Sequence, residues 1–589
     1  NITHQNLRTY MSLFLKKSVS QLLADADDSE KGLKRTLGSG SLIALGIGAI
    51  IGAGLFVRTA AAAAQNAGPS VTLGFIVAAV GCALAGLCYA ELSSSIPISG
   101  SAYTYTYATM GELLAWIIGW DLVLEYAVGA ATVGIAWSEY LNNLLVNVLH
   151  WKAISYEWCH SPFEMSKVLE FAYGTDFSSL HNSVNSAGNV LSDANFQALT
   201  QQTSGISNYL SSHNLNEASK QAYLASHHLQ ATLSSDELAS IAKSAPSFSN
   251  MIVTYKGMMN IPAFGIIALL SLLLIKGTKE SAFVNGLIVI AKVAIVVLII
   301  ILGWGFMNPA NHEHYIPAAQ TYVDSQKVSH NFGGIMGILG AAGVVFFAFI
   351  GFDAVSTAAQ ETKNPKKSMP IGILGSLAIC TVLYILFAHV LTGLADVQFF
   401  RTAGKEASVA KAIETFMPGY QWLSQLVTVA ILAGFSSVIL VMLLGQSRVF
   451  YSMSRDGLLP KVFSDVHPKF KTPYKANLIF MVVVGAFAAF IPGDIVGDMT
   501  SIGTLFAFML VCAAVIILRK TDPDHPREFK TPWVPVVPIL GIIVCGAMIF
   551  GLGWTNWMRL IVWLVVGFVI YFGYSKKHSK LQNQNQGKI

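Results

Sequence analysis

Charged residues are scarce in this sequence, and the shortage excludes an ordinary soluble protein. Only 12% of the 589 residues are Asp, Glu, Lys or Arg, and 53% are hydrophobic. A typical soluble domain carries about twice that charged fraction. The basic residues stand beside apolar blocks rather than on one face, so the net charge of +5 does not indicate nucleic-acid binding. The composition predicts a membrane protein instead.

Motifs for chemistry are missing as well. The six cysteines are scattered without paired spacing, so the sequence predicts neither a disulfide framework nor a metal site. We find no glycine-rich nucleotide loop, no cluster of metal ligands and no nucleophile motif. We therefore expect no enzyme, no metal and no cofactor.

Long apolar runs are abundant. Blocks that approach or exceed 18 residues are typical of transmembrane helices. The pattern predicts an all-α membrane protein with about twelve transmembrane helices, near residues 40–66, 71–96, 112–147, 261–276, 281–307, 333–360, 370–395, 420–454, 475–492, 497–519, 532–552 and 555–574. The third and eighth segments are too long for plain spans, so we expect them to tilt or to extend beyond the bilayer.

The distribution of positive charge predicts the orientation. Lysine and arginine concentrate in the N-terminal segment 1–39, in the tail 576–589 and in alternate loops, whereas most loops between these carry almost none. The loop at residues 400–414 is an exception. By the positive-inside rule, both termini of this multi-pass protein lie in the cytoplasm and the bilayer is the cell membrane.

Residues 150–258 interrupt the membrane pattern. They separate spans one to three (residues 40–149) from spans four to twelve (residues 259–575), and they are rich in Ser, Asn, Gln, Ala and His. The span count puts them outside the cell. Residues 215–245 have helical composition, so we predict a helical extracellular insertion. The simplest interpretation is a solvated insertion without a role in transport. The spacings of its histidines match no common metal site.

Two predicted spans are interrupted. The first contains GIGAIIGAGLF (residues 46–56), and the sixth contains Gly351 followed by Phe352 and the acid Asp353. These spans begin two five-span halves, 1–5 and 6–10. Interrupted segments at corresponding positions indicate the binding site of an inverted-repeat transporter. The alternative is that the glycines only allow close helix packing, as small-residue pairs do.

An interrupted span offers chemistry of its own. Glycine lets the backbone leave the helix, which frees N–H groups at the start of one half-helix and C=O groups at the end of the other. The positive helix ends attract a carboxylate, and the freed carbonyls can hold an ammonium group. The pattern therefore predicts a site for the zwitterionic backbone of an amino acid, built without buried charged side chains.

Four stretches, at residues 46–56, 97–141, 346–373 and 445–463, together resemble the cationic amino acid transporter branch of the amino acid–polyamine–organocation (APC) superfamily. With twelve spans, the chain is more similar to the bacterial members of that branch. The resemblance covers nearly all of the chain except residues 150–258 and the termini. It implies a leucine-transporter-type fold, with a 5+5 inverted repeat plus two extra helices.

The resemblance also implies the substrate site. In the family, the substrate carboxylate meets the unwound backbone of span one and the amino group meets span six. In this sequence the implied residues, with one side chain of span eight, are Ile50, Gly52, Ala53, Gly54, Phe347, Ala348, Ile350 and Met442. Many relatives have Ser or Thr where this chain has Ala53, so here backbone N–H groups alone would bind the carboxylate.

Three ionisable residues within the spans are candidates for proton coupling. Lys292 lies in the middle of span five, where a lysine costs at least about 2.5–3.5 kcal/mol, so a function is the default expectation. By resemblance it takes the place of a sodium ion between spans one and eight, near Gly48 and Ala49. Asp353 is expected either to cap the second half of span six or to act on substrate or protons. Glu125, on span three, is the third candidate, and structural pairing is its alternative.

These features predict a secondary active transporter that imports L-amino acids with protons by alternating access. Met442 offers no partner for a guanidinium group, which favours neutral, alanine-like substrates, whereas Asp353 leaves a cationic substrate such as arginine or lysine as the alternative. Other hypotheses are an exchanger without net proton coupling, and a nutrient receptor or partner-dependent light chain that uses Cys159. The sequence does not indicate whether a small single-span subunit binds.

Overall fold

The computed structural model describes residues 13–26, 35–52, 54–149, 151–171, 229–231, 252–323, 329–402, 408–551 and 554–585. Contacts divide the chain into two units. One comprises Asn1–Ile154 with Asn260–Ile589, and the other comprises Ser155–Met259. The first unit contains the apolar helices, and the second contains the polar insertion.

Helices occupy the predicted apolar segments of the first unit. Their bounds are α3 Ser39–Ile50, α5 Val71–Ser95, α7 Glu112–Val123, α8 Gly129–Asn143, α14 Ile261–Lys276, α15 Thr278–Trp304, α16 Gly334–Phe346, α18 Pro365–Leu394, α21 Gln421–Arg455, α22 Tyr474–Phe490, α23 Gly493–Thr521, α24 Val536–Gly551 and α25 Trp554–Ile570. Within the described residues, eight helical segments are long and apolar enough to cross a membrane, and four shorter apolar helices accompany them.

Shorter elements connect these helices. They are α2 Val19–Ala26, α4 Thr59–Ala62, α6 Ala102–Thr109, α17 Ala354–Thr357, α19 Val397–Thr402, α20 Ser408–Phe416, α26 Lys576–His578 and α27 Lys580–Asn585, with a hairpin of β4 Gln320–Val323 and β5 Ser329–Phe332. Local chemistry sets several boundaries. The Asn260 side chain accepts from the backbone N–H of Ala263, with Pro262 in the first turn of α14. Gly277, at φ 158°, separates α14 from α15.

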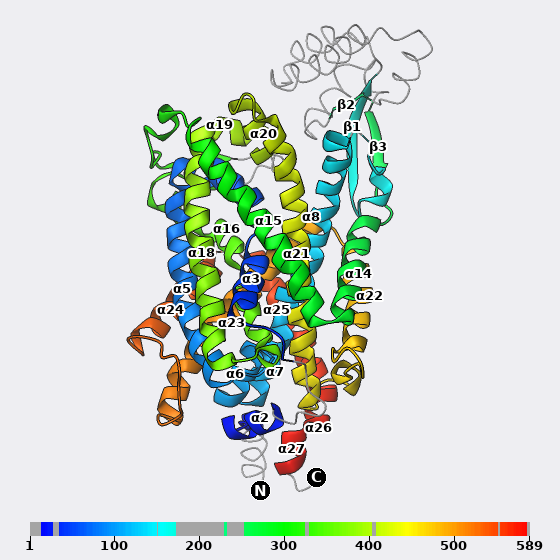
Figure 1. The fold of residues 1–589 in the computed structure, drawn as a ribbon, viewed down its shortest axis with the longest axis vertical. Coiled ribbons are helices and arrows are strands. Elements are labelled where there is room, and N and C mark those ends of the chain that lie inside the picture. The colour runs from blue at the N-terminus through cyan, green and yellow to red at the C-terminus, as the bar shows by residue number, and fades with distance from the viewer. Residues whose placement is uncertain are drawn as a thin grey trace. The chain divides into compact units, whose positions relative to one another are not determined.

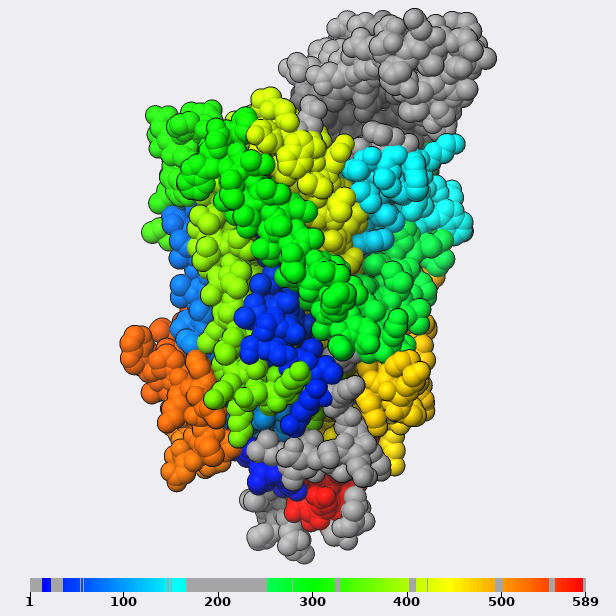
Figure 2. Space-filling view, viewed as in Figure 1, coloured from blue at the N-terminus to red at the C-terminus, as the bar shows by residue number. Residues whose placement is uncertain are grey.

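The first helix, α3, lies among α15, α18 and α21 (Figure 1). One side of its N-terminal half reaches the surface, as Figure 2 shows by the blue patch between green helices, and Gly40 and Ser41 are exposed there. Its C-terminal half is buried. The helix is therefore enclosed by protein at its C-terminal end and partly exposed at its N-terminal end.

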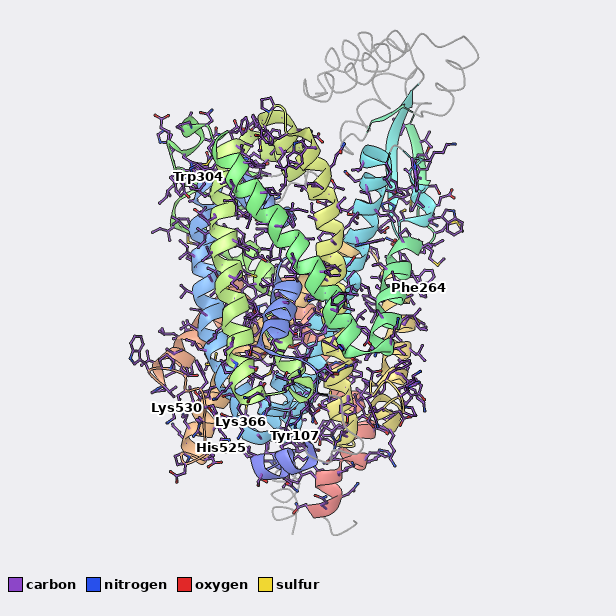
Figure 3. The ribbon with its side chains drawn as sticks, in the orientation of Figure 1. Tyr107, Phe264, Trp304, Lys366, His525 and Lys530 are labelled. Carbon is purple, nitrogen blue, oxygen red and sulfur yellow. The ribbon has the colours of Figure 1, made fainter. Side chains whose placement is uncertain are left out.

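Basic residues of the loops gather at one end of this helical unit. Lys366, His525 and Lys530 lie toward the same end as Tyr107, whereas Trp304 lies toward the opposite end (Figure 3). Residues from two of the segments that the positive-inside rule assigns to the cytoplasm thus lie toward the same end.

The described N-terminal and C-terminal segments meet at two acids on that same end. Glu112, which is fully buried, accepts hydrogen bonds from Tyr107, Tyr571, Ser579 and Gln582. Its backbone N–H donates to the carbonyl of Leu15, so α7 also holds the N-terminal segment.

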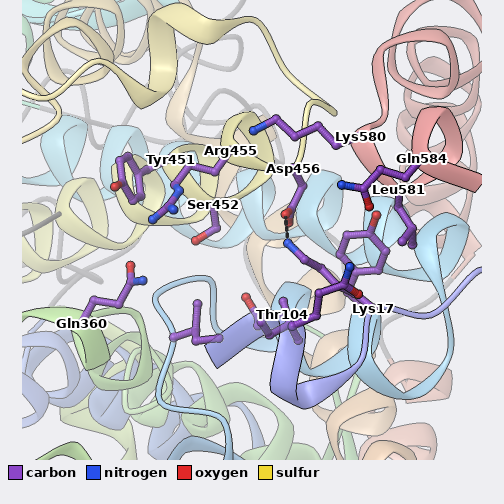
Figure 4. A pocket seen from close by; sticks show the side chains of 14 residues that line it. Lys17, Thr104, Gln360, Tyr451, Ser452, Arg455, Asp456, Lys580, Leu581 and Gln584 are labelled. Carbon is purple, nitrogen blue, oxygen red and sulfur yellow. Dashed lines mark hydrogen bonds and ion pairs between the residues drawn. The ribbon is translucent and has the colours of Figure 1, made fainter. Parts of the chain in front are cut away.

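The second acid, Asp456, completes the contact. Its carboxylate accepts from Lys17 Nζ at 2.7 Å and from the Tyr103 hydroxyl at 2.7 Å, and its carbonyl accepts from the N–H of Lys580. Beside it lies a cavity of about 320 Å³. Figure 4 shows Lys17, Arg455 and Lys580 around this cavity, from three parts of the chain.

The insertion corrects one prediction. Its described residues form a three-stranded antiparallel sheet in the order β2-β1-β3, from β1 Met165–Phe171, β2 Leu229–Ala231 and β3 Ile252–Lys256, with one short 3-10 turn at Tyr156–Trp158. The predicted helical insertion is wrong for these residues, and β2 falls within residues 215–245. Helical composition is a weak prior, which cross-strand pairing such as Leu169 with Ile252 overrides. The rest of residues 215–245 lies outside the described residues.

We predict that Glu112→Ala loosens the junction of the chain ends. Four donors lose their buried acceptor, and each unsatisfied donor costs about 1–3 kcal/mol before water enters. Thermal unfolding of the purified protein in detergent should show a clear fall in midpoint. The control Glu313→Ala removes an exposed acid and should leave the midpoint unchanged. Equal midpoints for the two variants would contradict the prediction.

Candidate functional site

Span one is interrupted where the sequence predicts it. Helix α3 ends at Ile50, the backbone turns extended at Ile51 (φ −76°, ψ 104°), and a π-helical turn, η1, begins at Gly54 and runs to Arg58. Ala53 lies outside the described residues. Ile50, Gly52 and Gly54 are all buried.

Span six is interrupted as well. After α16 the chain makes a 3-10 turn, η8 (Phe347–Phe349), then turns extended at Ile350 (ψ 136°). Gly351 follows at φ 109°, a conformation that favours glycine, and α17 begins at Ala354. A Cβ atom on Gly351 would lie 2.8 Å from the Cβ of Ala49, so the second break packs against the end of α3.

Close packing explains two glycines of span one. A Cβ on Gly54 would overlap the Cα of Ala348, and a Cβ on Gly48 would lie 2.5 Å from Oδ1 of Asn285. Both explanations of these glycines therefore apply: the span is interrupted, and the glycines allow close packing. At Gly54 the absent side chain lets the two breaks touch. The two breaks, with Ile50, Ala348 and their neighbours, form one buried region.

Lys292 caps the end of α3. Its side chain is fully buried, and Nζ donates to the carbonyls of Gly48 (2.9 Å) and Ile51 (2.7 Å) and to Oγ of Ser437 (2.8 Å). Ser437, on α21, donates in turn to the Gly48 carbonyl at 2.6 Å. All three ammonium hydrogens thus have acceptors, at the helix end where the dipole favours positive charge. The lysine joins spans one, five and eight.

Two buried acids lie together on spans three and six. Glu125 stands in a π-helical turn, η4 (Leu124–Val128), between α7 and α8, near Asp353, and both acids are fully buried. The Tyr126 hydroxyl donates to Asp353 Oδ2 at 2.5 Å. Asp353 stands at the N-cap position of α17, where one of its two predicted roles puts it, but its side chain makes no cap hydrogen bond. Its side chain points to span three instead.

Several carboxyl oxygens in this region have no hydrogen-bond partner among the described residues. They are both oxygens of Glu125, both of Asp121 and Oδ1 of Asp353. An isolated buried carboxylate is costly. This acid pair is therefore a candidate for binding a proton or a positively charged group.

Helix α21 supplies an apolar wall. A Cβ on Gly52 would lie 2.6 Å from Val438, and a Cβ on Gly129 would lie 3.0 Å from Sδ of Met442. Met442, 3% exposed, therefore packs on span three, and Val438, one turn earlier, covers the first break. Phe347 is only half-buried, and the guanidinium of Arg58 lies 5.3 Å from its ring centroid.

Two residues at the breaks were not predicted from the sequence. The Tyr384 hydroxyl, on α18, lies within hydrogen-bond distance of a carbonyl of each break, and Asn285, on α15, donates to the carbonyl of Ala44 at 3.0 Å. A tyrosine or asparagine inside an apolar run gives little signal of its role. Asn285 lies seven positions before Lys292, so both are on one face of the helix. That spacing is the sequence signal that could have assigned Asn285 to the same site.

Cavities adjoin the continuations of both interrupted spans. The cavity in Figure 4 is lined by Gln360, which follows α17. Another, of about 480 Å³, is lined by Ala63 in the continuation of span one, with His314 and Arg401 among others. Neither cavity is lined by residues of the breaks themselves.

The family follows from comparison with known proteins. The family model "Amino acid permease" matches residues 37–573. This chain belongs to the amino acid permease family. The predicted place in the APC superfamily is confirmed, and the protein is a helical, multi-pass membrane protein that transports amino acids.

Individual relatives support this assignment. The chain is 39% identical to the branched-chain amino acid permease BcaP of Bacillus subtilis (strain 168), over 97% of this chain and 99% of that protein. It is 35% identical to the methylthioribose transporter of the same organism, with the same coverage. It is 31% identical to the chloroplastic cationic amino acid transporter 9 of Arabidopsis thaliana, over 89% of this chain and 74% of that protein.

Substitution of Gly54 tests the contact between the breaks. We predict that Gly54→Ala forces Ala348 away, at a cost of about 1–3 kcal/mol for overpacking, and lowers uptake at least about tenfold. The matched control is Gly343→Ala in α16, where a Cβ would meet nothing within 4 Å. The control should keep uptake and gain a little helix stability. Similar uptake by both variants in proteoliposomes would show that the breaks tolerate separation.

Proposed function

We propose that the protein imports neutral L-amino acids together with protons, by alternating access, with the substrate backbone bound between the two breaks. The observation that carries the proposal is that the two interrupted helices contact each other at their breaks, and that Lys292 binds the end of α3 at the first break. Ile50, Gly52, Ala53 and Gly54 would supply backbone groups for the carboxylate, and Phe347, Ala348 and Ile350 would supply carbonyls for the amino group. No buried arginine or lysine is then required to bind the substrate carboxylate.

The topology proposed is twelve spans, with a 5+5 inverted repeat and two further helices. It is supported by helices in all predicted segments and by interruptions in the first member of each half. The gathering of basic loops at one end supports cytoplasmic termini in the cell membrane. The two cavities, each beside one interrupted span, suit the two ends of a substrate route.

A neutral side chain fits the surroundings of the breaks best. Val438 and Met442, which pack against the first break and span three, are apolar and offer no partner for a charged side chain. The relative named a branched-chain permease adds weight to aliphatic substrates, from alanine upward in size. The second candidate is a cationic amino acid, which the acids Glu125 and Asp353 and the cationic transporter relatives favour.

Proton coupling is proposed to act through Lys292. Protonated, it donates to Gly48 and Ile51 and holds the half-helix α3 against α21. When Lys292 loses a proton, its amine has two N–H hydrogens instead of three and binds these carbonyls less strongly. Helix α3 is then freer to move, because its other end is exposed. Glu125 and Asp353 are the further proposed proton groups. An exchanger or receptor remains the alternative, although Cys159, on which a disulfide-linked light chain would depend, is buried.

Competition experiments test the substrate class. In proteoliposomes with an inward proton gradient, unlabelled alanine, valine or leucine should inhibit uptake of labelled alanine better than arginine or lysine does, by about tenfold or more in inhibition constant, because one unpaired buried charge costs at least about 1.4 kcal/mol. Stronger inhibition by arginine would reverse the assignment and favour the cationic candidate.

The role of Lys292 is tested by its removal. We expect Lys292→Ala to lose uptake driven by a pH gradient, because its ammonium no longer links protonation to α3, while exchange of labelled for unlabelled substrate persists. Lys276→Ala, at an exposed lysine that ends α14, is the control. Full dependence of Lys292→Ala uptake on the proton gradient would rule the role out.

A further inference from the structure

The hydroxyl of Tyr384 lies between the two interrupted spans. It is 2.8 Å from the carbonyl oxygen of Ile50, the last residue of α3, and 2.9 Å from that of Ala348, in the 3-10 turn η8. The side chain is fully buried. One side chain of α18 thus contacts the carbonyl ends of both breaks.

The aromatic ring of Tyr384 is held firmly in place. Its centroid lies 5.4 Å from that of Phe75 on α5 and 5.2 Å from that of Phe349, which is itself part of the second break. Such tilted aromatic pairs are individually favourable. The hydroxyl therefore has a defined position, set by spans two and six together.

The donor and acceptor count at this point does not balance. A phenol hydroxyl carries a single hydrogen, so Tyr384 donates to either Ile50 or Ala348, and the other carbonyl has no second donor among the described residues. Lys292 already uses its three hydrogens on Gly48, Ile51 and Ser437. An unpaired carbonyl deep in a membrane protein is costly, and one further N–H donor at this point would relieve the cost.

We propose that Tyr384 is a positioning residue for the amino group of the substrate. This proposal rests on the proposed function. The hydroxyl holds the Ile50 and Ala348 carbonyls within reach of one small cation, and it turns to Ile50 alone when an ammonium group donates to Ala348. An ammonium group brings up to three hydrogens, so the site favours primary α-amino groups over N-alkylated ones, which bring fewer.

The test compares Tyr384→Phe with the wild type for two pairs of probes, L-alanine with N-methyl-L-alanine and L-leucine with N-methyl-L-leucine. Tyr571→Phe is the matched control, because it removes a buried hydroxyl that donates to Glu112. Uptake kinetics in proteoliposomes and thermal unfolding are measured for all three proteins. We expect Tyr384→Phe to raise KM for the primary amino acids about tenfold, equivalent to about 1.4 kcal/mol, because the Ile50 and Ala348 carbonyls are no longer held in position for the ammonium group.

Selectivity separates positioning from a merely structural role. If Tyr384 positions the amino group, the KM ratio of the N-methylated to the primary amino acid falls at least about threefold in Tyr384→Phe and is unchanged in Tyr571→Phe. The proposal is overturned if Tyr384→Phe keeps the KM ratio of the wild type and shows only a lower stability or a lower maximal rate. A wild-type protein that transports neither alanine nor leucine but does transport arginine or lysine overturns the neutral-substrate assignment, and the same comparison is then made with arginine and N-methylarginine.

Discussion

The need of a backbone to find hydrogen-bond partners inside a membrane governs this structure. An uninterrupted helix meets the need by itself, but α3 ends at Ile50 in the interior and leaves its last carbonyls without helical partners. Two neighbouring helices supply the donors. Lys292 of α15 serves Gly48 and Ile51, and Tyr384 of α18 serves Ile50. The interruption therefore depends on specific polar side chains around it, and these link spans one, five, six, seven and eight.

The same constraint shapes the second break. Gly351 takes a backbone conformation that other residues adopt only with strain, and it packs on Ala49. The contact of Gly54 with Ala348 needs the absent side chain. Small residues bring the breaks together, and polar side chains on α15 and α18 form hydrogen bonds with the backbone carbonyls that the breaks leave free. A protein that must change shape around this point gains from having the lysine and the tyrosine on different helices, since one contact can loosen while the other holds.

The acids of span three and span six differ from the break carbonyls, because several of their oxygens have no donor. Asp353 accepts one hydrogen bond from Tyr126, and Glu125 and Asp353 leave oxygens unpartnered in the described part of the chain. At the end of the unit where the chain termini meet, by contrast, Glu112 and Asp456 are surrounded by donors. The fully satisfied acids hold elements together. The unsatisfied pair retains the capacity to accept a proton, which is the physical reason for proposing it as a proton-coupling group.

Much of this arrangement follows from the sequence alone. Long apolar runs determined a helical membrane protein, the glycines of residues 46–56 and Gly351 determined where two spans break, and a lysine inside span five had to meet polar partners. The tertiary structure decided which partners these are. Gly48, Ile51 and Ser437 lie 145 to 244 positions from Lys292 in the chain, and no local pattern encodes such a contact. The sheet of the insertion was mispredicted for the same reason, because strand pairing outweighed local helical preference. The partner of the Asp353 side chain, Tyr126, also comes from a helix that is distant in sequence. Tyr384 acquires its role only from a position between two carbonyls that folding brings together.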